Sequence, residues 1–202
     1  MDTYKVILYL NNSLLFICAL IGIIKYKFFK NTEKWYVYYI IFLFLIEAVV
    51  KLCFYVFNLS DVNFIFPFYV AGEFLLLCIL FISKLKRSVY WYIPVGILTI
   101  LFLIDTQLVT NDVKKVISNI VVMCFAGYAL LTEIKSSKIN DRFILADSFI
   151  FLYYGLSVFL FFLLRQLSDL GKDEATMLWS INNILSSVLY LTFIYTFLRL
   201  KK

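Results

Sequence analysis

Residues Trp35–Phe57, WYVYYIIFLFLIEAVVKLCFYVF, form an apolar segment that is long enough to cross a lipid bilayer as a helix. The segment nevertheless contains Glu47 and Lys51, which are four residues apart and therefore share one face of a helix. Each of these side chains costs roughly 2.5 to 3.5 kcal/mol at the middle of a bilayer, so such residues normally face protein or trapped water. We therefore expect the other helices of the chain to pack around this face.

The composition of the whole chain is that of a membrane protein. Of its 202 residues, 63% are hydrophobic and 20% are aromatic, and the mean hydropathy is +0.92. Soluble domains are only about half apolar. The formal charge of +6 does not indicate a nucleic-acid partner, because the Lys and Arg residues cluster in short connections between apolar segments. That arrangement is typical of membrane topology, and the expected partner is the lipid bilayer.

The chain has few residues suited to metal or acid–base chemistry. It contains no histidine, which is the commonest zinc ligand and the commonest base at neutral pH. Its cysteines (Cys18, Cys53, Cys78 and Cys124) stand singly inside apolar segments, without metal-ligand spacing or a disulfide framework. We therefore predict no metal and no other cofactor.

The apolar segments predict an all-α, polytopic membrane protein with one seven-helix domain over residues 1–202. Most segments are near the ~20 residues that a ~30 Å hydrocarbon core requires. The fourth is the weakest, because it is short and has Pro94 in its first turns. The predicted transmembrane helices cover residues 6–24, 35–57, 63–83, 90–104, 116–132, 143–164 and 177–198.

The connections predict an orientation. Thirteen Lys and Arg residues follow the first, third, fifth and seventh segments, whereas five lie on the other side. Connections rich in Lys and Arg remain in the cytoplasm. We therefore expect the N-terminus outside, the C-terminus in the cytoplasm, and Lys114 and Lys115 in an outer connection.

Polar residues in five of the predicted helices fall at similar depths, in the outer half of the membrane. Glu47 and Lys51 lie there, and Glu73 reaches the same layer from the outer end of its helix. Such a layer predicts an outward-facing pocket for a small molecule or a lipid. The candidate ligand-binding residues are Asn12, Glu47, Lys51, Glu73, Asn119, Asn182 and Asn183.

Some of these residues also have a structural interpretation. Asparagines between transmembrane helices often form interhelical hydrogen bonds worth about 0.6 kcal/mol each, and a lysine such as Lys51 extends toward the interface. The acidic residues favour function, because one lysine leaves Glu47 and Glu73 with a net negative charge. One carboxyl group must then be protonated, bind a cation or meet a cationic ligand. Asp147 begins its helix, where the helix dipole favours a carboxylate, and we interpret it as structural.

Known membrane-protein architectures give three comparisons. Rhodopsins are excluded, because the last predicted helix has no lysine at its middle to bind retinal. The arrangement resembles the three-plus-one-plus-three helices of SWEET and PnuC transporters, and overlaying the two halves places Asn12 on Asn119; the Pro-Gln motif of the sugar carriers is absent. An intramembrane lipid hydrolase is the third alternative, suggested only by Glu47 and Glu73.

The chain also resembles a family of uncharacterised inner-membrane proteins of Gram-negative bacteria. The matching stretches are ICALIGIIKYK at 17–27, AGEFLLLCILF at 71–81 and SINNILSSVLYLTFIY at 180–195, together with Glu47. This resemblance implies a bacterial inner membrane, a membrane signalling partner, and roles for Glu47, Glu73 and Asn183. The expected function is a receptor-like or signalling module; a small-molecule transporter is the alternative, and an enzyme is less favoured.

Overall fold

Seven α-helices make up most of the chain in a computed structural model, which describes residues 3–59, 61–104, 110–135, 141–166 and 172–200. No β-strand occurs among these residues. Three short 3₁₀ turns, η1 (Tyr26–Phe28), η2 (Asn63–Ile65) and η3 (Val89–Trp91), lie in the connections. The helices are α1 (Thr3–Ile24), α2 (Lys34–Tyr55), α3 (Phe66–Lys84), α4 (Tyr92–Leu103), α5 (Asn111–Lys135), α6 (Ile144–Gln166) and α7 (Lys172–Arg199).

The prediction of an all-helical membrane protein with seven helices is confirmed, with one correction. Among the described residues, six helices are long and apolar enough to span a membrane. The exception is α4, whose 12 residues rise only about 18 Å, against a hydrocarbon core of about 30 Å. Even together with η3, which directly precedes α4, this apolar helical segment covers only Val89–Leu103 and is too short for a complete span.

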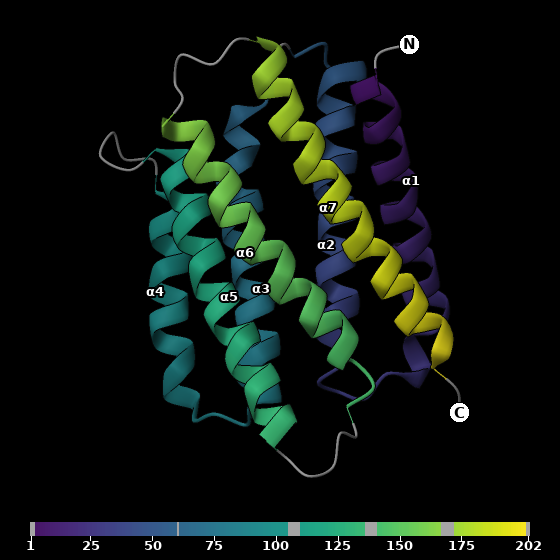
Figure 1. Cartoon of the computed structure of the whole chain (residues 1–202), viewed down its shortest axis with the longest axis vertical. Helices are drawn as coiled ribbons and strands as arrows, with labels where there is room; N and C mark the ends of the chain where they lie inside the picture. The colour runs from purple at the N-terminus through teal and green to yellow at the C-terminus, as the bar shows by residue number, and fades with distance from the viewer. Residues whose placement is uncertain (1–2, 60, 105–109, 136–140, 167–171, 201–202) are drawn as a thin grey trace.

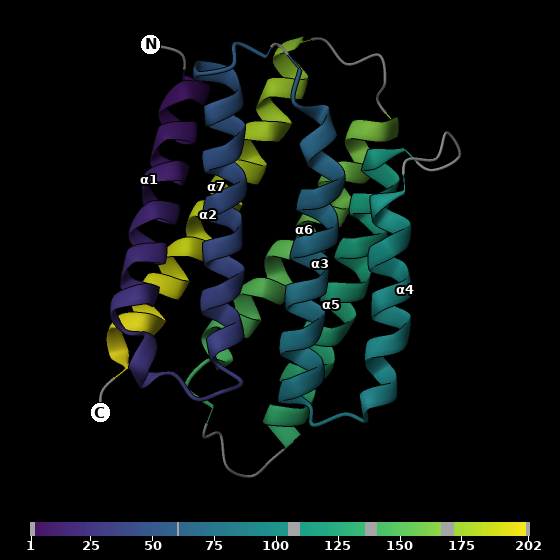
Figure 2. The ribbon, with the colours of Figure 1, turned by 180° about the vertical axis from the view of Figure 1, so that it is seen from behind.

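Six of the helices form a ring, and α4 lies outside it. Neighbours around the ring follow the order α1, α2, α3, α5, α6 and α7, and α7 packs against α1 to close it. Helix α4 packs on the outer side of α3 (Figures 1 and 2). We name the two ends of the bundle from Figure 1: α1, α3, α5 and α7 begin at the upper end and finish at the lower end.

Aromatic side chains fill the lower end of the ring. The Tyr36 ring stacks on Phe143 with centroids 4.5 Å apart, and Phe29 meets the edge of Phe197 at 5.0 Å. Phe193 packs against both Tyr36 and Phe197. All five side chains are buried, and they join the α1–α2 connection to α2, α6 and α7. This cluster closes the centre of the ring at its lower end.

A polar network (Tyr36, Lys84, Asp141 and Asp147) reinforces the same end. The Lys84 ammonium at the end of α3 pairs with Asp141, which precedes α6, and with Asp147 in the first turn of α6. The Tyr36 hydroxyl donates a hydrogen bond to Asp147. Asp147 is buried and has two partners, which agrees with its structural interpretation. We call these four residues the lower network; it ties α2, α3 and α6 together.

The start of α5 differs from the prediction and changes the chemistry of the core. The predicted helix began near residue 116, but α5 begins at Asn111. The five additional residues place Lys114 and Lys115 inside the helix, where both side chains are buried. Two lysines predicted for an outer connection therefore lie in the protein interior.

Candidate functional site

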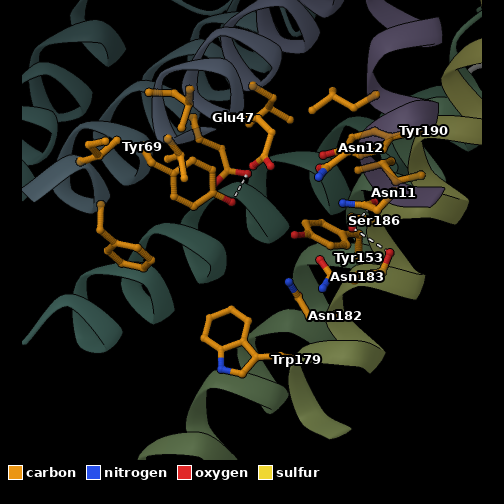
Figure 3. Close-up of a pocket in the computed structure, with 18 of the residues that line it drawn as sticks. Asn11, Asn12, Glu47, Tyr69, Tyr153, Trp179, Asn182, Asn183, Ser186 and Tyr190 are labelled. Atoms are coloured by element: carbon orange, nitrogen blue, oxygen red, sulfur yellow. Dashed lines mark hydrogen bonds between the residues drawn. The ribbon is translucent and has the colours of Figure 1, made fainter. Parts of the chain in front are cut away.

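A pocket of about 530 Å³ opens between the helices at the upper end of the ring. Five helices line it: α1, α2, α3, α6 and α7. In Figure 3, Glu47 and Tyr69 lie on one side of this space, and Asn12 and Asn183 on the opposite side. The polar residues of the lining are Asn11, Asn12, Glu47, Asn63, Glu73, Asn182, Asn183 and Ser186. Its aromatic residues are Tyr4, Tyr39, Phe66, Tyr69, Tyr153, Trp179 and Tyr190.

Helical periodicity explains why residues far apart in the sequence meet in this pocket. On α2, Tyr39, Leu43 and Glu47 follow one another at intervals of four residues and all line the pocket. On α3, Tyr69 and Glu73 have the same spacing. On α2 and α3, residues four apart in the sequence thus face the pocket together.

The floor of the pocket is an ion pair surrounded by tyrosines. The Lys115 ammonium of α5 pairs with Glu73 Oε2, and each of these side chains is only 1% exposed. The other carboxylate oxygen, Oε1, accepts hydrogen bonds from Tyr154 at 2.6 Å and from Tyr69 at 3.3 Å. Lys115 also donates to the Tyr69 hydroxyl at 3.0 Å. The carboxylate and the ammonium therefore have several hydrogen-bond partners, as a buried ion pair requires.

A fourth helix joins this floor through Tyr39. Its hydroxyl lies 3.1 Å from that of Tyr154. Because the Tyr154 proton is directed to Glu73, we infer that Tyr39 donates this hydrogen bond. We call Tyr39, Tyr69, Glu73, Lys115 and Tyr154 the floor network; its residues come from α2, α3, α5 and α6. Below it, the buried core and the aromatic cluster separate the pocket from the lower end.

Glu47 has a very different environment from Glu73. Its carboxylate lies 3.8 Å from the Lys51 ammonium, and the two side chains are 34% and 45% exposed. Among the described residues no hydrogen-bond donor is placed on this carboxylate. Lys51 does not line the pocket. The pocket therefore contains one carboxylate in a buried ion pair and one whose ammonium partner is 3.8 Å away and partly exposed to solvent.

Asparagines and serines form the side of the pocket opposite Glu47. The Asn11 side-chain oxygen accepts hydrogen bonds from Ser186 at 2.9 Å and Ser187 at 3.0 Å, which joins α1 to α7. Asn12, Asn182 and Asn183 line the same region. Asn11 thus acts as an interhelical contact, and its three neighbours provide amide groups to the pocket.

Five of the seven predicted ligand-binding residues lie together in the pocket: Asn12, Glu47, Glu73, Asn182 and Asn183. The other two, Lys51 and Asn119, do not line it. Lys51 lies beyond Glu47 and extends outward. Asn119 is buried between α5 and α6, where its amide donates to Ser157 at 3.0 Å. The overlay of Asn12 on Asn119 therefore pairs two residues in different environments.

Several residues of the pocket and of its floor network were not anticipated. Lys115 was predicted for an outer connection, and the tyrosines of the pocket were not among the candidate ligand-binding residues. The four-residue spacing of Tyr69 and Glu73 is the signal in the sequence that places a hydroxyl beside a buried carboxylate. No such signal exists for Lys115, because only the packing of α5 against α3 brings it to Glu73.

Comparison with known proteins shows no match of this chain to a family model, to a curated protein or to a solved structure. We therefore assign roles to the side chains from their contacts and burial. The hydroxyl of Ser186, the serine in the described lining, lies within hydrogen-bond distance of the Asn11 side-chain oxygen at 2.9 Å and of the Asn183 backbone carbonyl at 3.0 Å. No group of three metal-ligating side chains occurs in the described part of the chain.

Glu47 and Glu73 should differ strongly in their coupling free energies with Lys51 and Lys115, respectively. In a double-mutant cycle for Glu47 and Lys51, with both residues changed to Gln, we expect a coupling below about 1 kcal/mol, because the pair is open and solvated. The measurement is the free energy of unfolding of the two single variants and the double variant in mixed micelles. A coupling several times larger would show that the pair is close and desolvated, contrary to its geometry here.

Proposed function

We propose that this protein is a receptor-like membrane module that binds a small ligand in its upper pocket and acts through a membrane partner. One observation supports this proposal above the others. A pocket of about 530 Å³, lined by polar and aromatic side chains, is open at one end of the bundle and closed below by the floor network. Its volume is within the range of about 300 to 1,000 Å³ that is usual for small-ligand sites.

The arrangement of the two polar networks offers a route by which ligand binding would reach the lower end. Helix α3 contributes Glu73 to the floor network and Lys84 to the lower network. Helix α6 likewise contributes Tyr154 above and Asp147 below. A ligand that displaces α3 relative to α6 would alter both networks. The lower end would then present a different surface to a partner.

We assign the upper end to the outside and the lower end to the cytoplasm of a bacterial inner membrane, on the basis of the Lys and Arg distribution. The burial of Lys114 and Lys115 removes two positive charges from the outer connections, so the bias toward the lower end becomes stronger.

Cysteine labelling tests this orientation. In a background with the native cysteines replaced by alanine, we expect Asp61→Cys to react with a membrane-impermeant maleimide and Asn31→Cys to be protected in intact cells. Both positions are exposed, and they lie on either side of α2, position 31 before its first residue and position 61 after its last. Permeabilised cells, in which both positions should react, provide the control. The reverse pattern would place the pocket on the cytoplasmic side.

Binding is tested by filling the pocket. Thermal unfolding in detergent, measured with a panel of small amines, sugars and carboxylic acids, should identify a stabilising ligand. Asn183→Phe should abolish that stabilisation, because residue 183 lines the pocket. Ile184→Phe is the matched control. Ile184 is the next residue along α7 and its side chain is exposed, so this substitution should leave binding unchanged. Equal binding by both variants would contradict the proposal.

A transporter is the second candidate, because the lower network provides polar groups below the floor of the pocket. Tyr36, Lys84 and Asp147 form a second polar level on α2, α3 and α6. If two groups of helices rocked about the site, the pocket and the lower network would be exposed alternately to the two sides of the membrane. Counterflow of the bound ligand in liposomes, abolished by Asn183→Phe, would favour the transporter over the receptor.

A further inference from the structure

The charged side chains in the described lining of the pocket are both negative. Its described lining contains two carboxylates, Glu47 and Glu73, and no Lys or Arg. Lys115 compensates Glu73 from below. Glu47 keeps only the ammonium of Lys51, 3.8 Å away and outside the pocket. A carboxylate that is partly removed from water is stabilised by a nearby cation. An anion in the same space would be repelled.

The aromatic side chains of the pocket favour the same kind of ligand. Tyr69, Tyr153, Trp179 and Tyr190 line the same pocket as Glu47. In Figure 3, Tyr69 and Tyr153 lie nearer to Glu47 than Trp179 does. The faces of aromatic rings carry negative potential and attract ammonium groups, and aromatic cages recognise quaternary ammonium ligands in this way. Directly below the pocket, the protein uses this contact itself: Lys115 Nζ lies 4.3 Å from the centre of the Tyr69 ring.

An organic cation suits the pocket better than a metal ion does. A metal ion needs several clustered ligands, and the described residues contain no such group. A volume of about 530 Å³ accommodates a small organic molecule, whose polar end would meet the amides of Asn12, Asn182 and Asn183. The lining thus combines one available carboxylate, aromatic faces and uncharged hydrogen-bonding groups.

We propose that the pocket binds a small organic cation, an amine or quaternary ammonium compound, with Glu47 as its counter-ion and the aromatic side chains as its wall. This proposal rests on the proposed function, since it names the ligand class of the same pocket. The cation is either a free solute or the headgroup of a lipid, and the two share the same chemistry.

The decisive comparison uses choline and 3,3-dimethylbutan-1-ol, its neutral isostere. Binding is followed by the fluorescence of Trp179 in a Trp35→Phe/Trp91→Phe background, in a maltoside detergent that carries no charge. Choline should bind at least about tenfold more tightly than the alcohol, because the two differ only in charge at the group that meets the rings and Glu47. Ethanolamine and phenethylamine extend the series to primary amines.

Substitutions of Glu47 and Lys51, which share one face of α2, test whether Glu47 is the counter-ion of the bound cation. Glu47→Gln should weaken binding of the cation by about tenfold or more and leave binding of the alcohol unchanged. Lys51→Gln, one turn further along α2 and outside the pocket, should strengthen cation binding, because it removes a competing ammonium. Thermal unfolding of both variants without ligand confirms that they are folded.

The outcomes distinguish this inference from the proposed function. If no cation of the series changes Trp179 fluorescence, or if Glu47→Gln leaves cation affinity unchanged, the cation proposal is overturned. A neutral or acidic ligand that binds and is lost in Asn183→Phe would at the same time support the receptor.

A lipid headgroup is tested in nanodiscs. Phosphatidylcholine, compared with phosphatidylglycerol, should shift Trp179 fluorescence in a Glu47-dependent manner if the ligand is a headgroup. Free choline should shift it in phosphatidylglycerol discs if the ligand is a solute. No response in either arm overturns the cation proposal as well.

Discussion

Replacing Lys115 by methionine is expected to destabilise the folded protein by about 3 to 5 kcal/mol, because it leaves the Glu73 carboxylate buried without a cation. The hydroxyls of Tyr69 and Tyr154 would remain, but two neutral donors replace neither the charge nor the closest hydrogen bond. The measurement is the free energy of unfolding in mixed micelles, by detergent titration or steric trapping.

The double variant Lys115→Met/Glu73→Gln should regain at least half of that loss, because both charges are then removed from the interior. Lys114→Met is the control. Lys114 is equally buried, but its ammonium donates to the backbone carbonyl of Ile104, so its replacement should cost under about 2 kcal/mol. Equal losses at positions 114 and 115 would mean that Glu73 does not depend on Lys115.

Replacing Lys84 by methionine is expected to cost about 3 kcal/mol, since this lysine is the cation shared by Asp141 and Asp147. Without it, two neighbouring carboxylates would face each other, one of them fully buried beside Tyr36. Chemical unfolding of the purified protein measures the loss.

The matched comparison is Lys86→Met, two residues further on and exposed, which should change the stability by no more than about 0.5 kcal/mol. Adding Asp147→Leu to Lys84→Met should recover part of the loss, because it removes the buried charge that Lys84 had compensated. A double variant less stable than Lys84→Met alone would indicate that Asp147 stabilises the lower end through Tyr36 rather than through Lys84.

Much of the fold could be predicted from the sequence because hydrophobic length is a local property. Each long apolar run must satisfy its backbone hydrogen bonds internally to enter a membrane, so it becomes a helix. The limits of prediction also have a local origin. Lys114 and Lys115 are charged and stand directly before the apolar run of α5. The helix was therefore predicted to begin at about residue 116, whereas it begins at Asn111.

In the candidate site too, some residues could be identified from the sequence and others only from the structure. Charged and amide groups in apolar helices identified Glu47, Glu73, Asn12, Asn182 and Asn183 as interior residues, because lipid does not solvate them. Apart from Tyr69, which stands four residues before Glu73, the tyrosines of the pocket carried no comparable signal, since a tyrosine is equally suited to lipid interfaces, packing and polar sites. Asn119 has the same chemistry as Asn12, and only the neighbouring helix distinguishes a contact to Ser157 from a place in the pocket.

The sequence by itself determined that this is an all-helical membrane protein and which helices carry polar groups at depth, because hydropathy and helical periodicity act along the chain. Only the tertiary structure decided how those groups are paired. Lys51, four residues from Glu47, appeared to be the cation of the site, yet Glu73 pairs with Lys115, 42 residues away. The reason is that electrostatic pairing depends on distance in space, and the packing of α5 against α3 sets that distance.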